Sequence, residues 1–215
     1  MLNLLKNLIK MDWTSLYLKT SNLNVFILGT GEVATRRANK FLDHGANVKL
    51  AGNHLSLDLE SKGAALCSTS EVDDLVKWAD LVVVANNDEK LADYVCGISQ
   101  DKLINRADFP HEGDVIVPTS FNIAGIEISI FTNGKSPLMA RQLRKKIQSI
   151  ITDEDILEIE LQEYARGKLK ESVENQKIRR KYLYEIFDDD KINELIKNRE
   201  IGEAKSYIDN LIRGL

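Results

Sequence analysis

A glycine-rich turn near the start of the chain has the spacing needed to bind a dinucleotide. Residues 29–34 read Gly-Thr-Gly-Glu-Val-Ala, a G-x-G-x-x-A pattern that follows an apolar run and precedes a helical stretch. In this setting Gly29 permits a tight turn, Gly31 lets the backbone approach a pyrophosphate, and Ala34 lets the helix pack closely on the strand. The amides at the start of the helix then face the phosphates. The turn therefore predicts a dinucleotide site that includes Gly29 and Gly31.

The residues expected to bind the adenosine ribose are less typical of a NAD site. A carboxylate usually stands about 20 residues beyond the glycine turn, but here the second expected strand is followed by Asn53 and His54. Both side chains can hydrogen-bond ribose hydroxyls, and no Arg stands there for a 2′-phosphate, so we expect NAD rather than NADP. A purely structural turn, or a nucleoside site such as that of a methyltransferase, is the alternative.

Polar residues also follow two later strands of the expected sheet. Asn86 comes after the fourth strand and Asp108 after the fifth. Ligands of an open α/β sheet bind outside the carboxyl ends of its strands, so both residues should lie beside the glycine turn. We expect Asp108 to accept a proton from a substrate that lies over the nicotinamide. A solvated loop aspartate is the simpler alternative.

A basic segment follows farther along the chain. Residues 134–146 hold five cations and no anion, in a chain whose net charge is −4. Arg141, Arg144 and Lys145 share one face of an expected helix. Ser136 is suited to cap that helix, whose first amides add the positive end of the helix dipole. This composition indicates an anion-binding surface, or else a solvated basic face that answers the acidic run after the helix.

The alternation of strands and helices explains how these residues are positioned. From Asn24 to about Arg106, short apolar runs rich in β-branched residues alternate with helical stretches, which is typical of a parallel sheet with crossover helices. The expected strands are residues 25–28, 48–51, 65–68, 81–85 and 103–105, and the expected helices are residues 32–44, 72–78 and 89–99. We therefore expect an α/β fold with a Rossmann-type domain over residues 1–112.

The pattern changes after residue 112. Two strands are expected at residues 115–117 and 126–131, followed by a helix that begins at Ser136-Pro137 and runs to about residue 151. Beyond that point only helical spacing is found. We expect a small α+β segment at 113–150 and a C-terminal helical domain at 151–215.

Composition argues against several classes of protein. The net charge of −4 and the pI of 5.5 argue against nucleic acid or an anionic membrane as a partner. No apolar run approaches the roughly 20 residues needed to span a bilayer. Residues 1–10 do not read as a signal peptide, and we expect a short amphipathic packing helix or, alternatively, a membrane-surface helix. Cys67 and Cys96 have no ligand spacing, so we expect reduced thiols, no metal site and a cytoplasmic location.

Four segments, taken in order, resemble the precorrin-2 dehydrogenase family, which includes the N-terminal module of siroheme synthase. They are residues 28–50, 79–88, 105–108 and 128–147, and together they cover roughly residues 12–150. The last of them, ISIFTNGKSPLMARQLRKKI, is the most specific. A Ser/Thr-Gly-Gly-x-Ser-Pro-x-x-Ala-Arg stretch after a Rossmann unit is unusual outside this family.

The resemblance implies an activity and a set of site residues. The activity is NAD-dependent dehydrogenation of precorrin-2 to sirohydrochlorin, on the route to siroheme. The family's NAD contacts fall on Glu32, Val33, Asn53 and His54. The aspartate that the family uses in catalysis falls on Asp108. Asn86 stands where the family usually has Thr, beside the cofactor.

The resemblance also implies how substrate and partner subunit are bound. Precorrin-2 carries carboxylates around its rim, which suits the basic helix. The substrate contacts that we expect are Thr132, Lys135, Ser136 and Arg141. Residues 113–150 are expected to join two subunits into a homodimer. One departure affects this region, because Asn133 replaces the first Gly of the family's Gly-Gly pair and still carries a side chain.

Two other functions stay open at this point. The first is sirohydrochlorin ferrochelatase activity, additional or exclusive, in which Asp108 accepts the pyrrole N–H protons and His111 assists. The second is a non-enzymatic, NAD-sensing Rossmann module. Such modules usually keep the ribose-binding acid that this sequence lacks, and they have no need of the basic helix.

Overall fold

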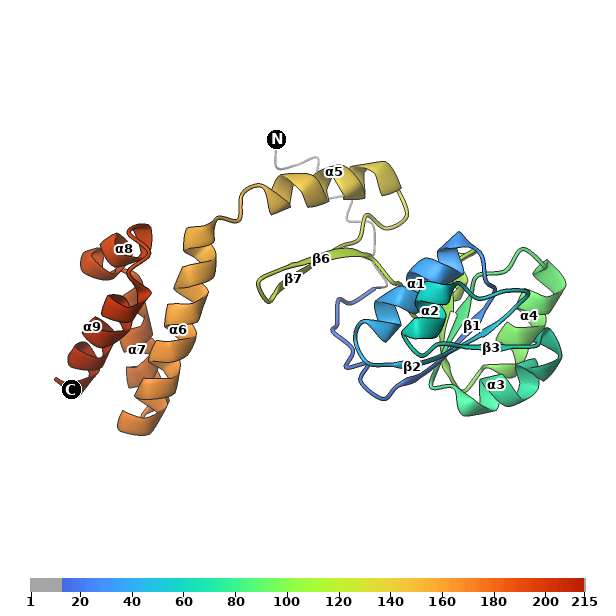
Figure 1. The fold of residues 1–215 in the computed structure, drawn as a ribbon, viewed down its shortest axis with the longest axis horizontal. Helices are drawn as coiled ribbons and strands as arrows, with labels where there is room; N and C mark the ends of the chain where they lie inside the picture. The colour runs from blue at the N-terminus through green and yellow to red at the C-terminus, as the bar shows by residue number, and fades with distance from the viewer. Residues whose placement is uncertain (1–12, 215) are drawn as a thin grey trace, which may run out of the picture. The chain divides into compact units, whose positions relative to one another are not determined.

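The structure is a computed structural model that describes residues 13–214. It divides into two compact units (Figure 1). The first unit comprises the described residues up to Pro118 together with Asn133–Lys135, and the second comprises Thr119–Thr132 and the described residues from Ser136 onward. The amphipathic helix expected at residues 1–10 lies outside the described part of the chain.

Within the described residues, the first unit is built on a five-stranded parallel sheet. Its strands are β1 (Asn24–Leu28), β2 (Asn47–Ala51), β3 (Ala65–Cys67), β4 (Leu81–Val84) and β5 (Leu103–Arg106). Their order is β3-β2-β1-β4-β5, so the chain crosses from one side of β1 to the other between β3 and β4. This order confirms the expected Rossmann-type fold. The strand order reverses beside the carboxyl end of β1, where the glycine turn begins.

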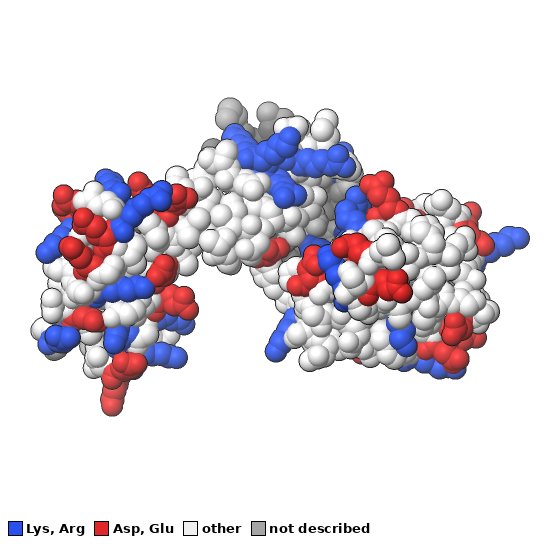
Figure 2. Space-filling model, viewed as in Figure 1, with Lys and Arg blue, Asp and Glu red and all other residues white. Residues whose placement is uncertain are grey.

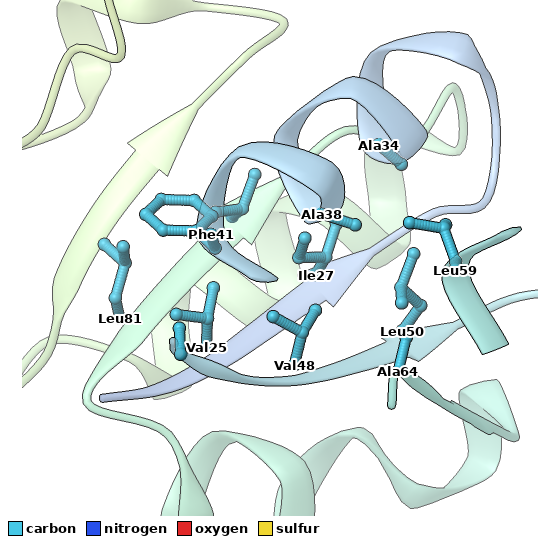
Figure 3. Close-up of a cluster of buried hydrophobic side chains, with 12 residues drawn as sticks. Val25, Ile27, Ala34, Ala38, Phe41, Val48, Leu50, Leu59, Ala64 and Leu81 are labelled. Atoms are coloured by element: carbon cyan, nitrogen blue, oxygen red, sulfur yellow. The ribbon is translucent and has the colours of Figure 1, made fainter. Parts of the chain in front are cut away.

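Helices cover both faces of this sheet. They are α1 (Glu32–Leu42), α2 (Leu57–Ser61), α3 (Val72–Trp78) and α4 (Glu89–Ile98), with short 3₁₀ turns η2 (Thr69–Glu71) and η3 (Pro110–Glu112). Alternate side chains of β1 belong to opposite cores. Val25 and Ile27 pack with Phe41 of α1 on one face (Figure 3), and Phe26 packs with residues of α3 and α4 on the other. Because β1 is buried on both faces, it is a continuous apolar run.

The second unit contains a hairpin and helices. The hairpin pairs β6 (Thr119–Ile123) with β7 (Ile126–Ile130) in antiparallel fashion. The helices are α5 (Pro137–Gln148), α6 (Asp153–Ser172), α7 (Gln176–Phe187), α8 (Asp190–Lys197) and α9 (Ile201–Arg213). Helices α6 to α9 share a core that includes the buried Leu161, Ile186 and Ile208, which confirms that the C-terminal region is helical.

The prediction of a strand at residues 115–117 is wrong. The backbone there is irregular: the Val115 N–H donates to the Ile104 carbonyl at 3.0 Å, and the Val115 carbonyl accepts from the Asn105 side chain at 2.6 Å. Val115 is apolar because it packs against one of the sheet cores, and not because it belongs to a ladder. The apolar side chain of Val115 thus reflects packing against the sheet core, whereas the sequence pattern suggested a strand.

The true partner of β7 is β6, which the sequence analysis missed. The residues of β6 read TSFNI and only Phe121 among them is buried, so neither an apolar run nor a clear alternation marks the strand. The turn that joins the two strands has φ of +47° at Ala124 and +91° at Gly125. Two positive φ values at the centre of a two-residue loop are typical of a type I′ hairpin turn. The short helix α2 was also not expected.

Candidate active site

Gly29 is a glycine because the fold requires it. It lies buried at the end of β1 with φ of +118°, a value that L side chains rarely adopt. A Cβ at this position would stand 2.2 Å from the carbonyl oxygen of Ala85, directly after β4. The Gly29 N–H donates to the Ala51 carbonyl at 2.8 Å. Gly29 thus lies where the carboxyl ends of β1, β2 and β4 meet.

The space around Gly31 is open, whereas the space around Gly29 is filled by neighbouring backbone. A Cβ on Gly31 would meet no atom within 4 Å, so the protein itself does not require glycine for space. Gly31 is the N-cap of α1 and has extended backbone, with no side chain capping the helix. The first amides of a helix need acceptors from outside the helix, and the helix dipole favours an anionic one. The start of α1 is therefore suited to a phosphate group.

The neighbouring residues have the burial that a dinucleotide turn needs. Ala34 is fully buried against the sheet core, as expected for close packing of α1. Glu32 is exposed, and Val33 is 39% exposed although it is apolar. Both side chains are accessible to a ligand at the start of α1.

The segment after β2 contacts the glycine turn. A Cβ on Gly52 would stand 2.5 Å from the Thr30 methyl group, so glycine at position 52 allows the turn to lie against the end of β2. The sequence analysis missed Gly52, because its role depends on two strands that are neighbours only in the sheet. Asn53 and His54 follow it and are exposed, as expected for residues that bind a ribose.

Asn86 shapes the loop after β4. Its side-chain oxygen accepts from the Asp88 N–H at 2.9 Å, and Asp88 in turn caps α4 by accepting from the Leu91 N–H at 3.1 Å. Asn86 is half-buried at the same sheet edge as Gly29. The side-chain amide nitrogen of Asn86 takes no part in this hydrogen bond.

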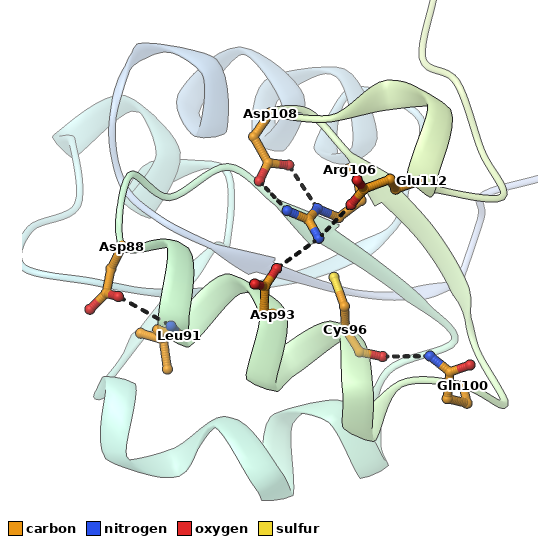
Figure 4. A network of polar contacts seen from close by, with 8 residues as sticks. All are labelled: Asp88, Leu91, Asp93, Cys96, Gln100, Arg106, Asp108 and Glu112. Atoms are coloured by element: carbon orange, nitrogen blue, oxygen red, sulfur yellow. Dashed lines mark hydrogen bonds and ion pairs between the residues drawn. The ribbon is translucent and has the colours of Figure 1, made fainter.

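Asp108 is held by Arg106 in a two-pronged ion pair. The Arg106 Nε donates to Asp108 Oδ1 at 3.0 Å and Nη2 donates to Oδ2 at 2.7 Å (Figure 4). The Arg106 side chain is 4% exposed and that of Asp108 is 22% exposed. Such paired N–H···O bonds fix the plane of a carboxylate as well as its charge.

Two further carboxylates converge on the same guanidinium. Nη1 of Arg106 lies 3.1 Å from Asp93 of α4 and 3.2 Å from Glu112 of η3. The Phe109 ring lies against the guanidinium, with 5.2 Å from Cζ to the ring centroid. Arg106 was not among the residues expected to act. A charged residue at the end of a short strand of the expected sheet was the signal available in the sequence.

The ion pair decides the charge state of Asp108. Partial burial raises the pKa of the Asp108 carboxyl, but hydrogen bonds from Arg106 and from the backbone N–H groups of Phe109 and Asp108 itself outweigh it, and the pKa is lowered. The same contacts raise the pKa of Arg106. At neutral pH Asp108 is therefore an ionised carboxylate that can accept a proton, and its basicity is limited by Arg106.

The residues expected to bind substrate lie in the loop before α5 and on α5. Lys135 belongs to the first unit, whereas Thr132, Ser136 and Arg141 belong to the second. Ser136 caps α5 by accepting from the Met139 N–H at 3.1 Å, which confirms the expected helix start.

The departure at Asn133 is accommodated in the loop. Asn133 has φ of +53° and Gly134 has φ of +72°, so both adopt the left-handed region that the family's glycine pair would favour. Asn is one of the few other residues that tolerate this region. The Thr132 hydroxyl lies 3.4 Å from the Ser136 N–H and closes the loop.

The basic side chains of α5 form one exposed surface. Arg141, Arg144, Lys145 and Lys146 are all exposed, and Figure 2 shows Lys and Arg gathered over this helix. Arg144 also lies over the Phe121 ring of β6, 5.7 Å from its centroid. Exposed apolar side chains, Leu138 and Met139, accompany the cations. The surface offers charge and apolar area together.

The sheet order and the glycine turn define a Rossmann-type nucleotide-binding protein, and comparison with known proteins agrees. Residues 16–119 match a family model described as "Putative NAD(P)-binding". A "Putative precorrin-2 dehydrogenase" of Methanocaldococcus jannaschii is 30% identical over 191 residues, which cover 80% of this chain and 89% of that protein. The chain belongs to the precorrin-2 dehydrogenase family.

Other relatives extend the comparison. A "Precorrin-2 dehydrogenase" of Priestia megaterium is 29% identical over 184 residues, with 82% of this chain and 90% of that protein covered. A "Siroheme synthase" of Mannheimia succiniciproducens is 24% identical over 205 residues, and this chain spans only 43% of its length. The solved structure of "SirC, precorrin-2 dehydrogenase" shares the fold, with a TM-score of 0.72, 24% identity, and coverage of 91% of this chain and 100% of that one.

Proposed function

We propose that the chain is a cytoplasmic, NAD-dependent dehydrogenase that oxidises precorrin-2 to sirohydrochlorin in the synthesis of siroheme. The observation that carries the proposal is that two features, the glycine turn and the Arg106–Asp108 ion pair, both lie at the carboxyl end of the parallel sheet. In the sheet register, Leu28 of β1 is paired with Val84 of β4, and Val84 with Arg106 of β5. The segments that follow these residues therefore begin side by side, as a cofactor and a proton acceptor require.

The cofactor role is assigned to the start of α1 and the end of β2. The open space at Gly31 and the uncapped amides beyond it suit a pyrophosphate. Asn53 and His54 are exposed at the next strand end and can hydrogen-bond the ribose. The absence of an Arg directly after β2 supports NAD over NADP. When bound, the nicotinamide supplies the hydride acceptor, and the chain supplies its orientation.

The proton role is assigned to Asp108. Its carboxylate is ionised at neutral pH, and both of its oxygens are held by Arg106. Arg106 fixes the plane of the Asp108 carboxylate. The lone pairs that do not bind Arg106 therefore point in a constant direction, toward which a substrate proton can be transferred. The lowered pKa means that a proton taken from the substrate is soon released to solvent.

The substrate role is assigned to the loop before α5 and to α5 itself. Thr132, Lys135, Ser136 and Arg141 offer hydroxyl and cationic donors, which suit a ligand with several carboxylates. Exposed Leu138 and Met139 of α5 offer apolar contact for a macrocycle.

The test is direct. Purified protein is mixed with NAD and precorrin-2, and reduced nicotinamide and sirohydrochlorin are followed by their absorbance. We expect both to form in equal amounts. If neither forms while precorrin-2 is stable, the proposal is wrong. A parallel assay with sirohydrochlorin and ferrous iron but no NAD measures ferrochelatase activity separately.

A further inference from the structure

A recess between α6 and α7 is lined by cations that are not among the residues discussed above. Its volume is about 230 Å³. Its lining, which we call the basic recess, consists of Arg166, Leu169 and Lys170 from α6 and Gln176, Arg179, Arg180 and Leu183 from α7. Four of these residues are cations and none is a carboxylate, in a chain whose net charge is −4. The basic recess is made wholly of residues of the second unit.

Helix electrostatics oppose only part of this arrangement. Arg166 and Lys170 are spaced i, i+4 on α6, where like charges destabilise a helix. The dipole of α6 favours Lys170, which lies in the last turn of that helix. Arg179 is the fourth residue of α7, near the positive end of that helix's dipole. The like-charge spacing of Arg166 and Lys170 is thus unfavourable in the absence of a counter-charge.

Among the described residues, no carboxylate forms an ion pair with a side chain of the basic recess. The ion pairs that the structure gives to Lys and Arg among the described residues of this unit join Lys181 to Glu185, Arg199 to Asp153 and Lys205 to Glu160. None of these pairs involves a residue of the basic recess. Glu185 and Glu160, on the two helices that form the recess, are thus paired with cations outside it.

One guanidinium of the basic recess is already held in place. Nη1 of Arg179 donates to the carbonyl oxygens of Val173 and Glu174, each at 2.7 Å, and so caps the end of α6. Arg179 is therefore oriented by the protein. Arg180 lies over the Tyr184 ring, 5.7 Å from its centroid, which leaves the edge of its guanidinium available to donate. Leu169, which is fully buried, forms an apolar floor beneath them.

We propose that the basic recess binds a small, multiply charged oxyanion, one that carries a phosphoryl group or two carboxylates. The volume of about 230 Å³ suits a ligand of several heavy atoms, since one water molecule occupies about 30 Å³ in the liquid. Arginine and lysine donors around one space are the groups that recognise such anions through charge-assisted hydrogen bonds. The site is separate from the proposed cofactor and substrate residues.

The test is titration calorimetry on the full chain with inorganic phosphate and with succinate, at an ionic strength held constant with chloride. We expect the parent to bind at least one of the two anions, and the stronger of the two identifies the phosphoryl or the dicarboxylate class. The double variant Arg166→Ser with Arg180→Ser should bind at least about tenfold more weakly, because each removes charge-assisted donors. Neither residue caps a helix, so circular dichroism should stay parental.

Two controls locate the binding. Lys181→Ser removes a cation from the same helix outside the basic recess, and Lys77→Ser removes an exposed cation from α3; each should leave the affinity within about twofold of the parent. The proposal is overturned if the parent binds neither anion, if the double variant binds like the parent, or if the affinity falls equally with Lys181→Ser or Lys77→Ser. If the double variant does not fold, Arg166→Gln alone provides the same comparison.

Discussion

Asp108 and Arg106 act as one unit in the proposed reaction. The guanidinium donates to both carboxylate oxygens, and it is shared with Asp93 and Glu112. One positive charge therefore faces three negative ones, and the shortest contact is to Asp108 at 2.7 Å. This arrangement lowers the pKa of Asp108 and fixes the orientation of its carboxylate, whereas a solvated loop aspartate would be free to rotate.

Replacing Asp108 by Asn tests its role in proton transfer. Asp108→Asn keeps the size of the side chain but cannot take up a proton. We expect NAD affinity to stay parental in calorimetry, while turnover falls about 10²–10⁴-fold, the usual contribution of a positioned acid or base. Asp93→Asn, which removes a more exposed carboxylate from the same Arg106, should turn over at nearly the parental rate. Parental turnover by Asp108→Asn would show that Asp108 is not the proton acceptor.

Replacing Arg106 tests what sets the pKa of Asp108. Because that pKa is lowered, the base form persists as pH falls through about 4, the ordinary range of Asp, and kcat/KM should hold there. In Arg106→Gln the burial that raises the pKa remains and the main lowering contact is gone, so the acid limb of the pH profile should move to higher pH. Arg106→Lys should restore part of the shift. An unchanged limb in Arg106→Gln would mean that another group controls the profile.

At the scale of elements, the two glycines of the turn serve different ends. Gly29 is needed by the fold, because any side chain there meets the carbonyl of Ala85. Gly31 lies in open space at the start of α1, and in the proposed function that space is taken by the pyrophosphate. The motif thus combines a packing constraint at Gly29 with a proposed binding constraint two residues later, so its spacing is restricted.

The substitution Gly31→Asp separates binding from folding. Asp is among the preferred N-cap residues, so α1 should be as stable as in the parent or more stable by a few tenths of a kcal/mol. Its carboxylate would occupy the phosphate position and repel a pyrophosphate, so NAD binding should be lost in calorimetry. Gly29→Ala is the contrasting variant and should lower the melting temperature. NAD affinity equal to the parent in Gly31→Asp would place the cofactor elsewhere.

A substitution in α5 tests the proposed substrate-binding role of this helix. Arg141 is exposed on α5, and in its proposed role it contacts carboxylates far from the reacting carbon. Such a contact contributes equally to ground state and transition state, so Arg141→Ala should raise KM roughly tenfold with little change in kcat. Lys146→Ala, on the same helix but off the face shared by Arg141 and Arg144, should change KM far less. A fall in kcat alone would mean that Arg141 acts in the chemical step.

At the scale of the whole molecule, we propose that α5 joins two copies of this chain. Within this helix only Ala140 is buried, whereas Leu138 is 64% exposed, Met139 50% and Leu143 38%. Apolar side chains grouped on one exposed helix are typical of an interaction surface, and the family resemblance indicates a homodimer.

Light scattering tests the dimer. We expect a mass of about twice 24.3 kDa at micromolar concentration. The double variant Leu138→Glu with Leu143→Glu should shift the mass to that of a monomer, because it puts charge into an apolar interface. Leu57→Glu, at a residue of α2 that is 82% exposed, should leave the mass unchanged. A monomeric parent would contradict the proposed homodimer.

The sequence by itself determined the parallel sheet, the glycine turn and the start of α5. Each of these depends on neighbours along the chain: an apolar run for a strand buried on both faces, a fixed glycine spacing, and a Ser-Pro pair that begins a helix. What only the tertiary structure decided depends on residues from different elements. Examples are the carboxylates around Arg106, the contact of Gly52 with Thr30, and the basic recess between α6 and α7. The polar strand β6 belongs with these, because its pairing with β7, and not its own composition, makes it a strand.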